Sequence, residues 1–258
     1  MISLESNIET QKLKPVTKID INSDLGEGAG HDEQLMRLIS SCSIACGGHF
    51  GDKDTMRIAV RLAKKHGVKV GAHPSFPDKD NFGRKLFTIT KEKLTETIFN
   101  QLCAFFSICE SEEYPIHHVK LHGALYNYAA KDAPTADAVV EAIIATKIRP
   151  KLYLQQGSIL HRKAENLLPL VFEAFIDRNY NDDLSLVSRS NPNALISRPM
   201  DAWRQLYGII EKGLVTTVDG EEKPITASTF CIHGDRENSV VILKYIHRQM
   251  EGRKISLE

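Results

Sequence analysis

Polar side chains, most of them ionisable, stand at or just after the ends of the strand-like segments of this chain. They are Asp24, Glu27, His49, His73, Lys120, His122, Gln156, Asp177, Arg178, His233 and Asp235. Carboxylates, imidazoles, amines and guanidinium groups carry the acid–base and electrostatic chemistry of enzymes. One polar strand end is common, but titratable groups at nearly every strand end are much less expected by chance. The pattern therefore predicts an enzyme.

Three of these residues have the chemistry of a metal site. Asp24, His49 and His73 follow three consecutive strand-like segments. Neighbouring strands lie about 4.8 Å apart, so side chains at their ends can converge on one ion. Two imidazoles and a carboxylate, with a position open for water, suit Zn²⁺ or a similar divalent metal. No fixed-spacing ligand motif such as HExxH supports the metal, and the alternative is that these side chains hydrogen-bond one another or a substrate.

Lys120 and His122 are two residues apart and therefore share one face of a strand. A lysine inside a folded core is costly unless it is paired, and Asp24 or Asp177 is the expected partner. In a functional role Lys120 would polarise a carbonyl or phosphoryl oxygen, with His122 as acid or base. A structural salt bridge is the alternative.

The stretch GAHPSFPDKDNFGR, residues 71–84, follows a strand-like segment and is rich in polar groups. Arg84 is a candidate for binding a carboxylate or phosphate, because its planar fork matches both. It can equally tie the loop down through Asp78 or Asp80. Residues 25–30, LGEGAG, only partly resemble a phosphate loop: His31 occupies the third glycine position of GxGxxG, and no Walker motif occurs. A tight turn is the favoured interpretation of LGEGAG.

Strand-like and helix-like segments alternate from Lys18 onward, about seven times. The predicted strands are 18–24, 41–47, 68–73, 117–123, 151–156, 170–177 and 228–235. The predicted helices include one capped by Asp52 or Asp54, one capped by Thr90, one opened by Ser197 and Pro199, and one over 237–250. This alternation predicts a mostly parallel sheet in one α/β domain over residues 18–258. Residues 1–17 read as a polar extension.

The faces of the predicted strands favour a closed barrel over an open doubly wound sheet. In 18–24, isoleucines on one face oppose polar residues on the other: Asp20, Asn22 and Asp24. Strands covered by helices on both sides should be apolar on both faces. A barrel with apolar residues outward and polar residues inward fits better, and its active site would lie at the C-terminal strand ends. An antiparallel sheet with a wet face is less favoured, because whole helices separate the strands.

The composition narrows the functional classes. Thirty-three basic and 33 acidic side chains balance, which gives no reason to expect nucleic-acid or acidic-membrane binding. No apolar run reaches the length of a membrane span, and the first residues lack the core of a signal peptide. Five cysteines without CxxC spacing predict reduced thiols in a cytoplasmic protein.

With these residues in view, the sequence closely resembles the LamB/YcsF family, whose members form the A subunit of ATP-dependent 5-oxoprolinase. The matching motifs are IDINSDLGEG (19–28), IACGGHFGD (44–52), GAHPSFPDKDNFGR (71–84), HVKLHGALYN (118–127), FEAFIDRNY (172–180), LVSRSNPNALI (186–196) and CIHGDREN (231–238). The resemblance covers nearly the whole chain and implies a TIM-like (β/α)₇ barrel of the glycoside hydrolase/deacetylase type. The family begins near Lys18, so residues 1–17 are additional.

The resemblance also implies a reaction and partners. The reaction is opening of 5-oxo-L-proline to L-glutamate, coupled to ATP hydrolysis, with partner subunits B and C; a homo-oligomer is compatible with it. Deacetylases of the wider superfamily bind a divalent metal through an aspartate and two histidines, and Asp24, His49 and His73 match in order. With no phosphate loop in this chain, a partner is expected to contribute to ATP handling.

The expected roles follow from this reaction. Asp24 or Asp177 would take a proton from water, while Lys120, His122 and Arg178 would stabilise developing negative charge. The residues expected to bind substrate are Glu27, Arg84, Gln156, His233 and Asp235. Two alternatives remain open: a stand-alone divalent-metal-dependent deacetylase or amidohydrolase, and a non-catalytic subunit that carries substrate or supports its partners.

Overall fold

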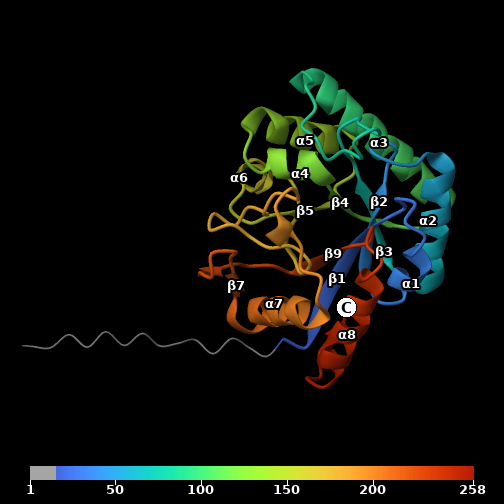
Figure 1. Cartoon of the computed structure of the whole chain (residues 1–258). Helices are drawn as coiled ribbons and strands as arrows, with labels where there is room; N and C mark the ends of the chain where they lie inside the picture. Colours follow the sequence, from blue (N-terminus) through green and yellow to red (C-terminus); the bar gives the residue numbers. More distant parts are fainter. Residues whose placement is uncertain (1–15) are drawn as a thin grey trace, which may run out of the picture.

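In the computed structural model, which describes residues 16–258, parallel strands close into a barrel (Figure 1). The strands pair in the order β1-β2-β3-β4-β5-β6-β9, and β9 also pairs with β1. Their bounds are β1 Lys18–Leu25, β2 Ser41–Ala45, β3 Lys69–His73, β4 Ile116–Lys120, β5 Lys151–Leu154, β6 Leu170–Phe175 and β9 Thr229–His233. The seven-stranded β/α barrel is confirmed.

Helices cover the outside of this barrel (Figure 1). They are α1 Asp32–Met36, α2 Lys53–His66, α3 Lys91–Ser111, α4 Gly123–Ala129, α5 Ala133–Ala145, α6 Ile159–Ala164, α7 Pro199–Lys212 and α8 Ser239–Glu251. Smaller elements are η1 Pro192–Ala194, β7 Leu214–Thr216, β8 Glu222–Pro224 and β10 Ser256–Leu257. Asp52 caps α2 as predicted, by accepting hydrogen bonds from the backbone of Asp54 and Thr55. The N-cap position of α7 is held by Arg198 rather than Ser197, and the Arg198 side chain makes no capping hydrogen bond to the α7 backbone.

The barrel has an apolar outer face and a polar interior, as the strand alternation predicts. Ile19 and Ile21 belong to the buried apolar layer of the core. Inside, Asn22 Nδ2 donates to Glu173 Oε1 at 2.9 Å and to Thr229 Oγ1 at 2.7 Å. Thr229 donates in turn to Asp20 Oδ2 at 2.6 Å. The interior is therefore a polar network hydrogen-bonded across different strands, in which Asp20 Oδ1 and Glu173 Oε2 keep no hydrogen-bond partner among the described residues.

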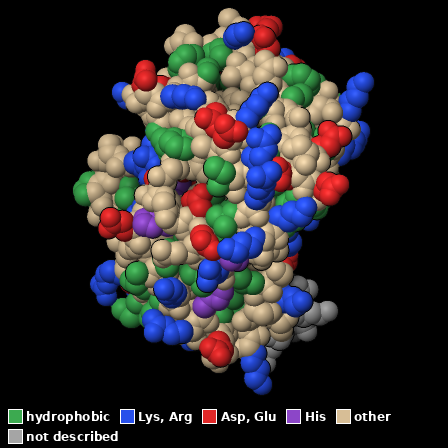
Figure 2. All heavy atoms as spheres, turned by 90° about the vertical axis from the view of Figure 1, so that its right-hand side faces the viewer, with side chains coloured by type: hydrophobic (Ala, Val, Ile, Leu, Met, Phe, Trp, Pro, Cys, Tyr) green, Lys and Arg blue, Asp and Glu red, His purple; other side chains and the backbone are tan. Residues whose placement is uncertain are grey.

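The C-terminal strand β10 lies beside the start of β1 at the N-terminal side of the barrel. β10 pairs in parallel with the start of β1, and Ser256 N donates to Thr17 O at 2.9 Å. The predicted extension over 1–17 lies almost wholly outside the described residues, and it stays a prediction. On the face drawn in Figure 2, basic and acidic side chains are interspersed, in agreement with the balanced composition. Among the described residues, no helix is long and apolar enough to cross a membrane.

Candidate active site

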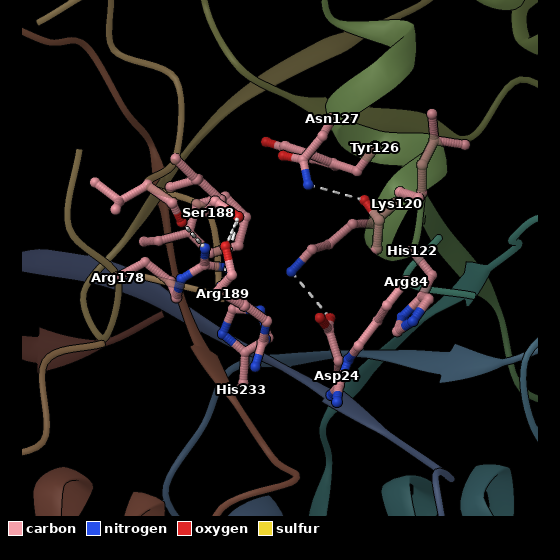
Figure 3. A pocket seen from close by; sticks show the side chains of 17 residues that line it. Asp24, Arg84, Lys120, His122, Tyr126, Asn127, Arg178, Ser188, Arg189 and His233 are labelled. Atoms are coloured by element: carbon pink, nitrogen blue, oxygen red, sulfur yellow. Dashed lines mark hydrogen bonds and ion pairs between the residues drawn. The ribbon is translucent and has the colours of Figure 1, made fainter. Parts of the chain in front are cut away.

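A cavity of about 330 Å³ opens at the C-terminal ends of the strands (Figure 3). Six of the residues singled out in the sequence line it: Asp24, Arg84, Lys120, His122, Arg178 and His233. Because parallel strands all point the same way around a closed barrel, side chains at their ends converge on one mouth. The cavity is therefore the place where the strand-end groups can act on a common ligand.

Lys120, the last residue of β4, is fully buried beneath this cavity. Its Nζ lies 2.9 Å from Asp24 Oδ1 and 2.8 Å from Glu173 Oε1. Asn22 Oδ1 and Cys231 Sγ each lie 3.0 Å from the same Nζ. The three protons of the ammonium group are therefore surrounded by four acceptors. Burial alone would lower the pKa of Lys120, but Asp24 is the leading influence that holds this pKa well above its usual value. The expected pairing with Asp24 is present, and Glu173 is an additional partner.

Asp24 lies between this lysine and a group of histidines. Its Oδ2 is 3.3 Å from His73 Nε2, while its Oδ1 contacts Lys120. Burial would raise the pKa of Asp24, yet the charges of His73 and Lys120 hold this pKa well below its usual value. Asp24 is therefore a carboxylate in the folded protein. A carboxylate with so low a pKa is a weak general base, and its geometry suits charge stabilisation better than proton abstraction.

Four buried side chains next to Asp24 bring their ligand atoms within 4.8 Å of one another: Glu27, His49, His73 and His122. Glu27 Oε1 is 2.8 Å from His49 Nε2, 3.3 Å from His122 Nδ1 and 3.8 Å from His73 Nε2. Ligands of a tetrahedral Zn²⁺ lie about 3.3 Å from one another, given metal–ligand bonds near 2.0–2.1 Å. The spacing in this four-residue cluster is thus close to that of a metal site.

The hydrogen bonds behind the cluster fix which nitrogen of each ring faces inward. His73 Nδ1 donates to the carbonyl of Lys120 at 2.8 Å, and His122 Nε2 donates to the carbonyl of Phe82 at 2.9 Å. The inner nitrogens, His73 Nε2 and His122 Nδ1, then face each other at 3.0 Å. If both rings were neutral, the lone pairs of these two inner nitrogens would point at each other. A proton or a cation must therefore lie between them. A carbonyl-bound outer nitrogen is also what metal-ligating histidines commonly have.

The donor set therefore fits a divalent metal, with one change from the sequence-based prediction. Glu27, expected to bind substrate, and His122, expected to act in catalysis, belong to the four-residue cluster with His49 and His73. Asp24 touches His73 but is not one of the four. Burial lowers the pKa of His49 to about 4 and also lowers the pKa of His122. Neutral imidazoles are the form that binds a metal. Burial alone would lower the pKa of His73, but the Asp24 carboxylate raises it, so a metal would have to displace a proton from that ring.

The loop after β3 supplies part of this geometry. Phe82 has φ 54°, a left-handed conformation that is unfavourable for a bulky residue, and its carbonyl accepts the His122 hydrogen bond. Gly83 follows with φ 60°, and a Cβ atom there would lie 2.9 Å from both His122 and His49. Arg84 does not bind Asp78 or Asp80: its guanidinium pairs with Asp235 and lies 4.7 Å from the Phe82 ring centroid.

A second pair of groups lies on the other side of the cavity. Asp177 is fully buried and accepts from the Nδ1 of His233 at 3.0 Å and from its backbone N at 3.1 Å. Burial would raise the pKa of Asp177, but His233 holds this pKa below its usual value. Asp177 does not line the cavity, whereas His233 does. An ionised Asp177 places the proton on Nδ1 and leaves Nε2 of His233 as the basic atom.

The two remaining predicted residues, Arg178 and Gln156, lie in different places relative to the cavity. Arg178 lines the cavity, but its Nη2 donates to Val187 O at 2.6 Å and its Nε to Ala194 O at 3.3 Å. Gln156 lies exposed beyond the end of β5 and does not line the cavity, so the structure does not bring it to the site. Sequence reasoning missed further cavity-lining residues: Tyr126, Asn127, Phe175, Ser188 and Arg189. Their motifs, HVKLHGALYN, FEAFIDRNY and LVSRSNPNALI, were the available signal.

The comparisons with known proteins agree with this architecture. A family model described as the LamB/YcsF family matches residues 19–258. The A subunit of 5-oxoprolinase from Haemophilus influenzae strain PittEE is 41% identical over 241 residues, which are 93% of this chain and 98% of that protein. The corresponding 5-oxoprolinase A subunit of Histophilus somni strain 129Pt is 40% identical over 239 residues, 92% of this chain and 97% of that protein.

A solved structure shows the same fold. The crystal structure of a lactam utilization protein from Thermus thermophilus superposes with a TM-score of 0.87 at 36% sequence identity. The match covers 93% of this chain and 99% of that chain.

Proposed function

Because the chain belongs to the LamB/YcsF family, we propose that it is the A subunit of an ATP-dependent 5-oxoprolinase. The reaction is hydrolytic opening of 5-oxo-L-proline to L-glutamate, coupled to hydrolysis of ATP to ADP and phosphate. The observation that carries this proposal is the cavity over the Lys120–Asp24 pair, with the Asp177–His233 pair across from it. Its volume of about 330 Å³ is sufficient for an amino-acid-sized lactam.

The proton chemistry is assigned to His233. Water attack on the lactam carbon requires removal of a proton, and the leaving nitrogen requires one. Asp177 holds the Nδ1 proton of His233, so Nε2 can accept a proton from water and later return it. This changes the sequence-based expectation, because Asp177 acts through His233 rather than on water directly.

Electrostatic stabilisation is assigned to the Lys120–Asp24 pair. Lys120 already has four acceptors, so its ammonium would bind the lactam oxygen only by releasing one of them. In a buried site this charge acts at low dielectric, where it stabilises negative charge on oxygen strongly. Asp24 keeps Lys120 protonated and oriented while the ring opens.

A divalent metal, if bound, would be held by Glu27, His49, His73 and His122. Bound there, it would supply Lewis-acid polarisation of an oxygen or a water of lowered pKa. The residues of this chain bind and orient the lactam beside that cluster, and they exclude water from the buried base of the barrel.

ATP is assigned to the assembled enzyme rather than to a site in this chain alone. An unstrained amide is a poor electrophile, and transfer of the γ-phosphoryl group of ATP to its oxygen, with release of ADP, makes the ring carbon more electrophilic. Water attack then expels the ring nitrogen and leaves an acyl phosphate, from which a second water releases phosphate and L-glutamate. LGEGAG is not shaped as a phosphate loop, since Gly26 N donates to Asp32 Oδ2 at 2.9 Å within a tight turn. Subunits B and C therefore take part in ATP handling in this proposal, and free, mostly buried thiols support a cytoplasmic location.

The decisive experiment is reconstitution. The chain is combined with subunits B and C, and glutamate release from 5-oxo-L-proline is measured with and without ATP. The proposal expects release only when ATP and all three subunits are present. Equal release without this chain would show it to be dispensable and would refute the assignment.

The four-residue cluster favours one second candidate, a metal-dependent amidohydrolase or deacetylase that acts alone. That enzyme would turn over a lactam or an acylated substrate with Zn²⁺, Co²⁺ or Mn²⁺ and no ATP. Running the same assay on the isolated, metal-replete chain separates the two candidates.

A further inference from the structure

Two arginines stand together on one side of the cavity. Figure 3 shows Arg178, Arg189 and Ser188 across the opening from Asp24 and Lys120. Arg178 lies three residues after the end of β6, and Arg189 lies further along the loop between β6 and α7. The cavity therefore has a cationic wall that faces the Lys120–Asp24 pair.

The cationic side chains of the cavity differ in how many carboxylates already neutralise each of them. Lys120 contacts two carboxylates, and Arg84 pairs with Asp235. Among the described residues, the only carboxylate within ion-pair range of Arg189 is Asp235, 4.0 Å away and already engaged by Arg84. The side chain of Arg189 is 30% exposed, so it is reachable from the opening.

Arg178 fixes the loop that carries Arg189. Its guanidinium donates to the carbonyls of Val187 and Ala194, one on each side of Arg189. The turn is closed by Asn191 N, which donates to Ser188 O at 2.8 Å. Arg189 is thus presented from a backbone segment that is held at both ends, which reduces the entropy lost when its side chain binds a ligand.

The two guanidinium groups also influence each other. Burial lowers the pKa of Arg178 to about 10, and the charge of Arg189 is the next cause. Among the described residues Arg178 has no carboxylate within ion-pair distance, and an anion bound beside two like charges relieves their repulsion. A carboxylate matches guanidinium groups through paired N–H···O hydrogen bonds.

We propose that Arg189, supported by Arg178, binds the carboxylate of the substrate and makes the site specific for lactams that carry an acid group. This inference rests on the proposed function. In 5-oxo-L-proline the carboxylate and the lactam carbonyl stand on the two carbons that flank the ring nitrogen. With the carboxylate on Arg189, the carbonyl can point across the cavity toward Lys120. An uncharged ring such as 2-pyrrolidinone lacks this anchor.

The test uses the full chain with subunits B and C, and the variants Arg189→Gln and Arg189→Lys. Arg204→Gln is the matched control, because Arg204 is 72% exposed on α7 and does not line the cavity. KM and kcat are measured for 5-oxo-L-proline and for ATP, and calorimetry measures binding of 5-oxo-L-proline and 2-pyrrolidinone to the wild type and each variant. Thermal melting checks that all variants fold.

For Arg189→Gln we expect KM for 5-oxo-L-proline and its dissociation constant to rise about tenfold to a hundredfold, the value of a lost charged hydrogen bond. Binding of 2-pyrrolidinone should stay weak and unchanged, KM for ATP should not move, and Arg189→Lys should be intermediate. If Arg189→Gln and the wild type bind 5-oxo-L-proline equally well, the carboxylate-binding role of Arg189 is overturned and the proposed function is not. A rise in KM for ATP only would assign the arginines to phosphate and overturn the carboxylate role. Failure of the wild type to bind or turn over either lactam would overturn the proposed function together with the anchor.

Discussion

His73 Nε2 and His122 Nδ1 face each other at 3.0 Å, while the outer nitrogen of each ring donates to a backbone carbonyl. This relationship joins the ends of β3 and β4 and leaves both inner nitrogens without a proton of their own in the neutral state. A buried pair of this kind holds either a shared proton or a cation. The nearby Glu27 carboxylate makes a cation favourable.

Metal binding is the first prediction. Metal-stripped protein titrated with Zn²⁺ should bind one ion through the four-residue cluster. Glu27→Gln and His122→Ala should weaken binding at least about tenfold, since each removes a ligand. Asp24→Asn should keep the stoichiometry, because Asp24 is not one of the four. Mass spectrometry and calorimetry provide the readout; loss of the ion in Asp24→Asn with retention in Glu27→Gln would return the site to Asp24, His49 and His73.

Removal of the buried lysine should cost both activity and stability. Lys120→Ala leaves Asp24 and Glu173 buried without their cation, which should lower the free energy of unfolding by about 3–5 kcal/mol. The matched variant combines Lys120→Met with Glu173→Gln, which removes one charge of each sign. Urea denaturation should show much of the stability restored in this double variant, while glutamate release stays lost. Restored activity would contradict an electrostatic role for Lys120.

The Asp177–His233 pair should act as one unit. Asp177→Asn and His233→Gln should each lower kcat by about a hundredfold or more, since the first misplaces the ring proton and the second removes the base. The double variant should be little worse than either single one. Steady-state kinetics over a pH series give the readout. Additive losses would mean that the two residues serve separate steps.

Gly83 should be intolerant of a methyl group. In Gly83→Ala the new Cβ would meet His122 and His49 at 2.9 Å, so metal affinity and the melting temperature should both fall. Gly157→Ala is the control: its φ of 77° imposes a similar backbone cost, but nothing lies within 4 Å of the added atom. If both variants lose metal affinity equally, backbone strain rather than contact with the histidines is responsible.

Stability should fall on mild acidification, in part through His117. Burial and the charges of Lys151 and Lys69 lower the pKa of His117 from 6.5 to about 4. Between these values the unfolded chain binds a proton that the folded chain does not, so stability decreases as pH falls from 6.5 toward 4. His117→Gln should reduce the slope of unfolding free energy against pH by up to one proton. An unchanged slope would show that His117 is protonated in the folded protein.

The sequence alone determined the barrel and the strand-end groups. The alternation of Asp20, Asn22 and Asp24 with isoleucines set the inward face, because successive side chains on a strand point to opposite sides. A second rule placed Lys120 and His233 at the cavity: parallel strands around a barrel all end at one mouth. These are local regularities of backbone geometry, which sequence patterns record directly.

Loop paths were decided only by the tertiary structure. Glu27 joins the cluster because the chain turns at Gly26, with φ 71°, and the sequence favoured Asp24 for that position. Arg189 reaches the cavity because Arg178 holds the loop around it, whereas Gln156 turns away into solvent beyond β5. Strand periodicity cannot specify such positions, since they depend on hydrogen bonds between residues distant in sequence. Local sequence therefore determines where the strands end, whereas tertiary contacts determine which polar groups at those ends become partners.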